Sequence, residues 1–155
     1  TQDWHPSDHS SFASQHASHD PFHIIDMPYG SQTLWPDHCV MGTEGAAFHE
    51  DLIIDHADLI IRKGFRRHID SYSAFFENDQ TTPTGLEGYL RNRSIQQLTV
   101  VGLATDFCVR FSAQDAARLG FDVTVELNLC RGIDMNHSLD EAITFMQRDG
   151  IQIKP

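Results

Sequence analysis

The stretch whose residues are best suited to catalysis is Val100–Cys108, where an apolar run leads directly into a predicted helix. The run is typical of a buried strand, and Thr105 or Asp106 can cap a helix that ends before Gly120. Cys108 then lies in the first turn of that helix, where unpaired N–H groups and the helix dipole favour a thiolate. A thiolate is a nucleophile at neutral pH. The alternative is a small buried cysteine that packs the helix against a sheet.

Asp3 and His5 are candidate metal ligands, because alternate side chains of an extended segment point to the same side. His38 could supply a third ligand, and His9 is an outside candidate. Two histidines and one carboxylate, with open positions for water or substrate, suit Zn²⁺, Fe²⁺ or Mn²⁺. The alternative is a solvated polar loop, because the histidines up to His23 lie in a segment rich in turn-forming residues.

Lys63 ends an apolar run, and a lysine there can stabilise a developing oxyanion or a thiolate in a cleft. It could equally extend its ammonium group into water. Three aromatic residues in the predicted loops, Trp35, Tyr72 and Phe75, could form the walls of a site for a flat ligand or simply anchor those loops.

The elements that must position these residues alternate between strands and helices. Strands are predicted over 57–63, 97–104, 121–127 and 151–153, a helix precedes Gly120, and two capping boxes at 84–87 and 138–141 begin two more helices. Residues 6–50 and 65–83 are predicted to be long loops. The alternation predicts a three-layer α/β/α domain with a parallel sheet over residues 1–155. Residues 1–3 also read as the end of a strand, so Asp3, Lys63 and residues 104–108 all lie at the carboxyl ends of strands, where ligands bind.

Composition excludes several classes of function. The 155 residues carry a net charge of −11, which disfavours nucleic acid and anionic membranes as partners. No apolar run reaches the roughly 20 residues that span a bilayer, and no secretory signal is recognisable. Three cysteines are an odd number without a framework spacing, which favours free thiols in a reducing cytoplasm.

Taken together, five segments resemble the nicotinamidase/pyrazinamidase branch of the isochorismatase-like cysteine hydrolases, and the bacterial nicotinamidases most of all. The segments occur in family order across almost the whole chain: QDWHP at 2–6, WPDHCV at 35–40, KG at 63–64, DSYSAFF at 70–76 and GLATDFCV at 102–109. The joint match is highly specific.

The resemblance implies a role for each of these candidates. Cys108 would be the nucleophile, with Lys63 as its neighbour in the catalytic triad. Asp3, His5 and His38 would hold one divalent metal ion, usually zinc, iron or manganese.

The resemblance also implies a cis peptide bond between Leu103 and Ala104, which turns the N–H groups of Ala104 and Cys108 toward an oxyanion. Trp35 and Tyr72 would contact the nicotinamide ring.

The third member of the family's triad is an aspartate on a first strand, and residues 1–155 match the family only from its second strand onward. We therefore expect the chain to be N-terminally incomplete, without that strand and its helix. Asp8, Asp37 and Asp106 do not lie where the missing carboxylate would be. A purified chain of these 155 residues is expected to show very low turnover.

The implied activity is hydrolysis of nicotinamide, and of pyrazinamide, to the acid and ammonia through a cysteine thioester. This reaction belongs to NAD salvage in the cytoplasm. The sequence leaves undecided whether the protein forms a homo-oligomer. One alternative is a related hydrolase of another small amide or carbamoyl compound, although relatives without a pyridine substrate often lack this metal motif. The other is a metal-binding or interaction domain without turnover.

Overall fold

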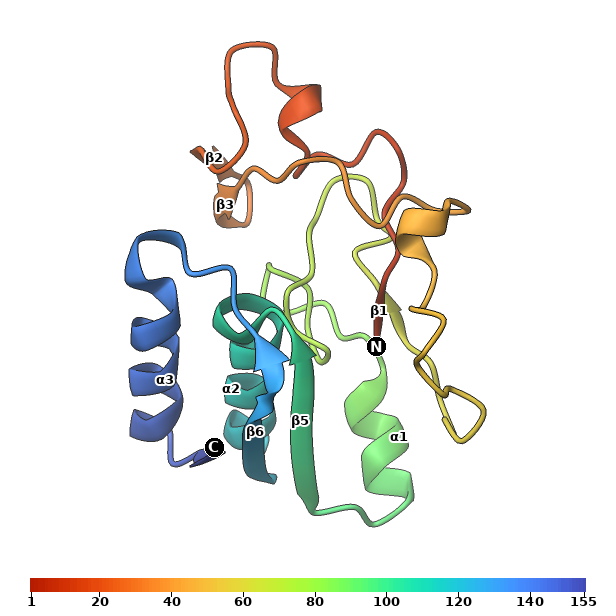
Figure 1. Cartoon of the computed structure of the whole chain (residues 1–155), viewed down its shortest axis with the longest axis vertical. Coiled ribbons are helices and arrows are strands. Elements are labelled where there is room, and N and C mark those ends of the chain that lie inside the picture. Colours follow the sequence, from red (N-terminus) through yellow and green to blue (C-terminus); the bar gives the residue numbers. More distant parts are fainter. The chain divides into compact units, whose positions relative to one another are not determined.

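The computed structural model describes residues 1–155, which form two compact units. The N-terminal unit comprises residues 1–71 and 77–81, and the C-terminal unit comprises residues 72–76 and 82–155. Figure 1 labels their strands and helices. No helix has both the length and the apolar character needed to cross a lipid bilayer.

The N-terminal unit has little regular structure. Its two parallel strands are β1 (Gln2–Asp3) and β4 (Arg62–Lys63), and β2 (Ile24–Met27) forms an antiparallel hairpin with β3 (Gly30–Thr33). Short 3-10 turns occupy Ala13–Gln15 and Glu44–Ala46. The hairpin lies inside the segment predicted to be loop, so that prediction was incomplete.

The predicted buried strand over 57–63 was wrong for most of its length. Only Arg62–Lys63 is paired, and Leu59 and Ile60 are 41% and 43% exposed. The reason is the register: β1 offers two residues for pairing, and Asp3 lies opposite Lys63. The apolar run before Arg62 has no neighbouring strand to pair with, so hydrophobicity alone did not make it a strand.

The C-terminal unit is a regular α/β structure. Its parallel sheet has the order β5 (Gln97–Leu103), β6 (Asp122–Arg131) and β7 (Gln152–Lys154), and its helices are α1 (Leu86–Asn92), α2 (Arg110–Arg118) and α3 (Ser138–Arg148). The predicted strands here are confirmed, and β6 continues to Arg131 instead of ending at Leu127.

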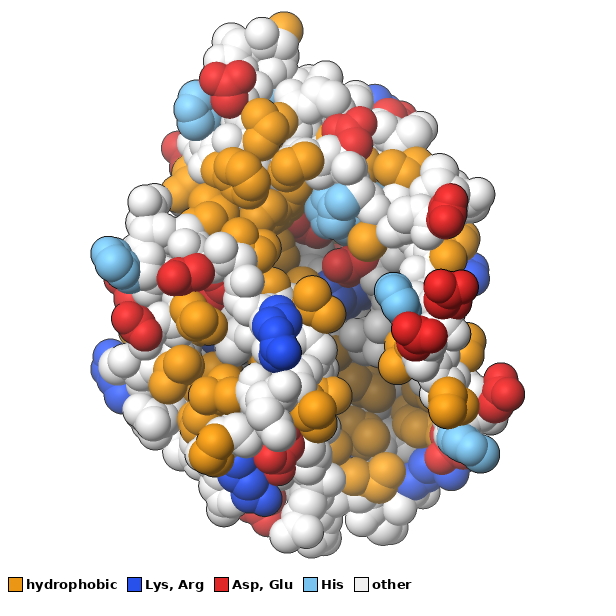
Figure 2. Space-filling model, in the orientation of Figure 1, with side chains coloured by type: hydrophobic (Ala, Val, Ile, Leu, Met, Phe, Trp, Pro, Cys, Tyr) orange, Lys and Arg blue, Asp and Glu red, His pale blue; other side chains and the backbone are white.

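Small residues let α2 pack closely on the sheet and on α3. Ala113 and Ala116 of α2 are completely buried, as are Val125 of β6 and Met146 of α3. Figure 1 shows α2 beside β6, and α3 packs on α2 and β7. On the visible surface, hydrophobic side chains are interspersed with charged ones (Figure 2).

The predicted helix starts were only partly right. Cys108 lies in a π-helical turn, Thr105–Val109, and α2 begins after it at Arg110. The Asp106 carboxylate does not cap this helix, because it binds residues 133–138 instead. The Ser138 hydroxyl does not cap α3 either, since it donates to Asp106. Thr84 does accept a hydrogen bond from the Leu86 amide at α1.

Truncation of a core residue tests this packing. Met146→Ala in α3 is expected to lower the free energy of unfolding by about 2–5 kcal/mol, because it leaves a cavity beside α2. Urea denaturation of the complete protein measures this change. Gln147→Ala, at the next and exposed position, is the control and should change stability by less than about 0.5 kcal/mol. Equal losses in the two variants would contradict this account of the core.

Candidate functional site

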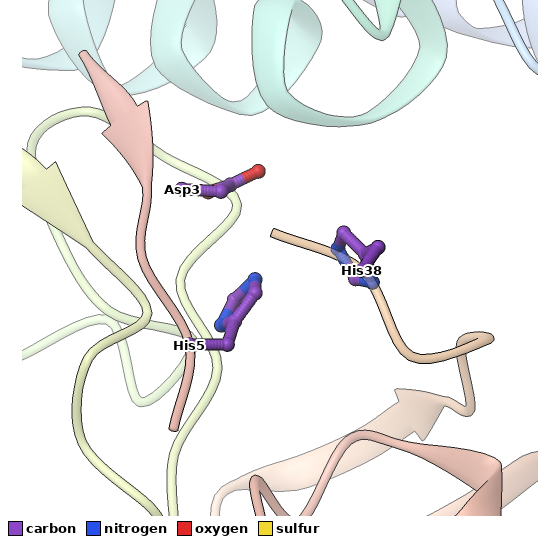
Figure 3. Close-up of side chains that lie close together, drawn as sticks. All are labelled: Asp3, His5 and His38. Atoms are coloured by element: carbon purple, nitrogen blue, oxygen red, sulfur yellow. The ribbon is translucent and has the colours of Figure 1, made fainter. Parts of the chain in front are cut away.

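The structure brings Asp3, His5 and His38 together in the N-terminal unit. One ligand atom from each lies within 4.8 Å of the other two. Figure 3 shows the three side chains pointing toward a common space, Asp3 and His5 from the end of β1 and His38 from a separate loop. Backbone hydrogen bonds hold that loop in place, since the His5 amide donates to the Cys39 carbonyl and the Met41 amide to the His5 carbonyl, at 2.9 and 2.8 Å.

Backbone carbonyls decide which ring nitrogen of each histidine can bind a metal ion. His5 Nδ1 lies 2.8 Å from the Gly64 carbonyl oxygen, and His38 Nδ1 lies 2.8 Å from the Pro36 carbonyl oxygen. A carbonyl can only accept, so in the neutral form of each ring Nδ1 carries the proton and Nε2 keeps its lone pair. In that form both rings can bind a metal ion through Nε2.

Gly64 leaves room for the His5 ring. Its φ is +65°, and a Cβ at this position would lie 2.3 Å from His5 Cε1. Any larger residue would displace the ring and strain the backbone, so a glycine after Lys63 is required by both the conformation and the contact.

Lys63 is buried and does not extend into water. Its Nζ donates to Asp3 Oδ1 at 2.5 Å and to the Ser71 carbonyl at 2.6 Å, and only 4% of the residue is exposed. Burial by itself would raise the pKa of Asp3, but the Lys63 ammonium offsets this and leaves that pKa below its ordinary value. Asp3 is therefore a carboxylate at neutral pH, as metal binding requires.

His9 lies directly behind His5, with ring centroids 4.6 Å apart, and is completely buried. Its Nε2–H donates to the Ile69 carbonyl at 3.2 Å, and its Nδ1 accepts from the Ser11 hydroxyl at 2.7 Å. Both nitrogens are thus used by the protein, which favours a supporting role over metal ligation.

Asp70 is a buried carboxylate that the ligand analysis of the sequence missed. Its carboxylate forms a second cluster with His5 and His9, with ligand atoms again within 4.8 Å of one another. Asp70 accepts from Gln32 Nε2 at 3.0 Å and from the Ser71 amide at 2.8 Å. The only signal in the sequence was its place in the DSYSAFF segment, because no spacing rule connects it to the histidines.

In the C-terminal unit, the turn that follows β5 presents Cys108. The Phe107 and Val109 amides both donate to the Ala104 carbonyl, at 3.1 and 3.0 Å, which closes the turn. The peptide bond before Ala104 is cis, as the resemblance implied. Cys108 is partly exposed and forms no disulfide.

The aromatic candidates have different surroundings. Trp35 is buried in the N-terminal unit, with its ring edge against Phe22 at 6.2 Å between centroids. Tyr72, in the C-terminal unit, packs on Phe107 and Phe111 at 5.6 and 5.3 Å. Tyr72 is thus beside the turn that carries Cys108. Phe75 is a core residue and anchors its loop.

The buried histidines make stability depend on pH. Burial lowers the pKa of His5 and of His9, so the unfolded chain binds protons that the folded chain does not as pH falls below about 6.5. Without metal, the free energy of unfolding should therefore fall between pH 7 and pH 5, as measured by urea denaturation. His9→Gln should reduce this fall. His19→Gln, at an exposed position, should keep it, and an equal reduction in both variants would refute the assignment.

Comparisons with known proteins agree with these features. The family model described as Isochorismatase domain matches residues 14–153. The nicotinamidase of Acinetobacter baylyi is 53% identical over 152 residues, which are 98% of this chain and 71% of that protein.

Solved structures are similar over nearly the whole chain. The nicotinamidase/pyrazinamidase of Acinetobacter baumanii has a TM-score of 0.97 at 55% identity, with 99% of this chain and 74% of that chain covered. The pyrazinamidase of Pyrococcus horikoshii, solved in complex with zinc, has a TM-score of 0.74 at 31% identity, with 98% and 71% covered. On the match of the family model and on the extent of these similarities, the chain belongs to the isochorismatase family.

Proposed function

We propose that the complete protein is a nicotinamidase, an amidohydrolase that converts nicotinamide, and also pyrazinamide, to the acid and ammonia. The observation that carries this proposal is the cluster of Asp3, His5 and His38 in a chain whose relatives are named nicotinamidases. We further propose that it acts in NAD salvage in the cytoplasm, where the three reduced cysteines would persist.

The N-terminal unit supplies a donor set that fits one divalent metal ion. Asp3 is ionised through its contact with Lys63, and His5 and His38 each keep an Nε2 lone pair. Two imidazoles and one carboxylate suit zinc, iron or manganese, and the related pyrazinamidase solved with zinc favours the first of these. Held by Asp3, His5 and His38, the ion would supply Lewis-acid chemistry for the pyridine nitrogen of the substrate.

Cys108 is the proposed nucleophile. Its thiolate attacks the carboxamide carbon, the C–S bond forms, and the C–N bond then breaks to release ammonia. Water hydrolyses the resulting thioester to the acid. The N–H groups of Ala104 and Cys108 are the proposed donors to the oxyanion, and such donors contribute about 3 kcal/mol each.

The leaving nitrogen needs a proton, which comes from the Cys108 thiol. The resemblance to the family assigns this transfer to an aspartate, a role for which we propose none of these 155 residues. We assign to Lys63 the charge-balancing role that the resemblance implies, and its ammonium is held in the N-terminal unit by Asp3 and by the Ser71 carbonyl.

Removal of the nucleophile tests the reaction directly. Cys108→Ala in the complete protein should lower ammonia release from nicotinamide by at least about a thousandfold, while bound metal stays at the parental stoichiometry. Ammonia release and elemental analysis measure the two quantities. Cys130→Ala removes a buried thiol of β6 and is the matched control, expected to keep activity. Parental activity in Cys108→Ala would end the proposal.

A panel of other small amides and carbamoyl compounds, assayed on the parent, tests the substrate. Nicotinamide and pyrazinamide should be hydrolysed most efficiently. A clear preference for a compound without a ring nitrogen would contradict nicotinamide as the substrate. It would favour the alternative, a hydrolase of the same fold that acts on another small amide.

Metal affinity can be tested without an activity assay. Gly64→Ala should weaken metal binding by at least about tenfold, because the added Cβ would displace the His5 ring. Competition with a chromogenic chelator measures the dissociation constant. Gly45→Ala in the same unit is the control, since its Cβ would meet only Thr43 Oγ1 at 3.7 Å. Unchanged affinity in Gly64→Ala would show that His5 does not bind the ion.

A further inference from the structure

Two segments of the C-terminal unit leave the same edge of its sheet. Leu103 at the end of β5 pairs with Arg131 at the end of β6, and the strands are parallel. The turn that carries Cys108 follows β5, and residues 132–138 follow β6. Ligands of parallel sheets bind beyond this edge, so residues 132–138 border the same space as Cys108.

One carboxylate connects these two segments. Asp106 Oδ1 accepts from the Ile133 amide at 3.0 Å, and Oδ2 accepts from the Asp134 amide at 2.8 Å and the Ser138 hydroxyl at 2.5 Å. Asp106 is only 2% exposed, so these hydrogen bonds replace its hydration. Such charge-assisted bonds are among the strongest that a side chain forms.

The segment needs this anchor because its backbone is unfavourable. Asp134, Asn136 and His137 have φ values of 58°, 52° and 69°, in the left-handed region, which costs free energy for any residue other than glycine although Asp, Asn and His tolerate it better than most. A chain of this conformation persists only where surrounding contacts hold it. Asp106 provides three such contacts from a neighbouring segment.

The Asp106 carboxylate is ionised at neutral pH. Burial would raise the pKa of Asp106, but the hydrogen bonds from Ser138, Ile133 and Asp134 outweigh burial and lower that pKa below its ordinary value. All three donors therefore have an ionised acceptor at neutral pH.

We propose that Asp106 is a positioning residue for the reaction at Cys108. It fixes residues 132–138 beside the nucleophile turn, so that this segment, with the half-exposed apolar side chain of Ile133, forms one side of the substrate pocket. The proposal rests on the proposed function for the identity of the substrate. The anchor itself does not depend on it.

The kinetic test compares two buried carboxylates in the complete protein. Asp106→Asn should raise KM for nicotinamide about tenfold with a smaller change in kcat. The reason is that residues 132–138, once less well fixed, would stabilise the bound substrate and the transition state less by similar amounts. Asp115→Asn is the matched control, because Asp115 is equally buried in α2 but pairs with Arg118. It should keep KM, even where both variants lose stability.

Hydrogen exchange tests the anchor independently of activity. The Ile133 and Asp134 amides should exchange at least about tenfold faster in Asp106→Asn than in the parent, and at the parental rate in Asp115→Asn. Ser138→Ala removes one donor of the three and should give a smaller effect on exchange and on KM. If Asp106→Asn does not fold, hydrogen exchange and KM are measured on Ser138→Ala instead.

The outcomes separate the two proposals. Unchanged exchange at Ile133 and Asp134 would overturn the anchor, and faster exchange with an unchanged KM would overturn its role in the pocket. An equal rise of KM in Asp115→Asn would do the same. A parent enzyme that releases no ammonia from nicotinamide would overturn the proposed function, and the exchange experiment would still decide whether Asp106 anchors the segment.

Discussion

The contact between Lys63 and Asp3 is the constraint on which the N-terminal unit depends. The β1–β4 register sets these residues opposite each other, and the buried ammonium reaches the partly exposed carboxylate at a distance of 2.5 Å. A buried ammonium without a partner would cost several kcal/mol, so Lys63 depends on Asp3 to be stable there. The pair keeps Asp3 ionised, and an ionised Asp3 next to His5 and His38 makes this corner of the unit suited to a cation.

Around this pair, the unit is held more by hydrogen bonds of side chains than by sheets or helices. Backbone carbonyls orient the rings of His5 and His38, and the Asp70 carboxylate accepts hydrogen bonds from the Gln32 side chain and the Ser71 backbone amide. Such an arrangement is stable because nearly every buried polar atom has a partner. It also means that the ligand geometry depends on residues, such as Gly64, that do not themselves bind a metal ion.

The C-terminal unit follows the opposite plan, with regular strands and helices around an apolar core. Its site elements are the irregular ones, namely the π-helical turn with Cys108 and residues 132–138. Asp106 illustrates how local rules are overridden there. By sequence it is a helix cap, but its carboxylate gains more from three donors across the sheet edge than from one amide of its own turn.

The sequence alone was sufficient for features that depend on near neighbours. The apolar run before Cys108, the helix that ends before Gly120 and the Asp3-x-His5 spacing all follow from local periodicity, and the structure contains the strand, the helix and the paired side chains of Asp3 and His5. Only the tertiary structure could decide the short β4, the hydrogen bond between His9 and Ile69, and the burial of Asp70 beside Gln32. Each of these depends on a pairing partner or a donor far away in the chain, and the local pattern of residues carries no information about which partner that is.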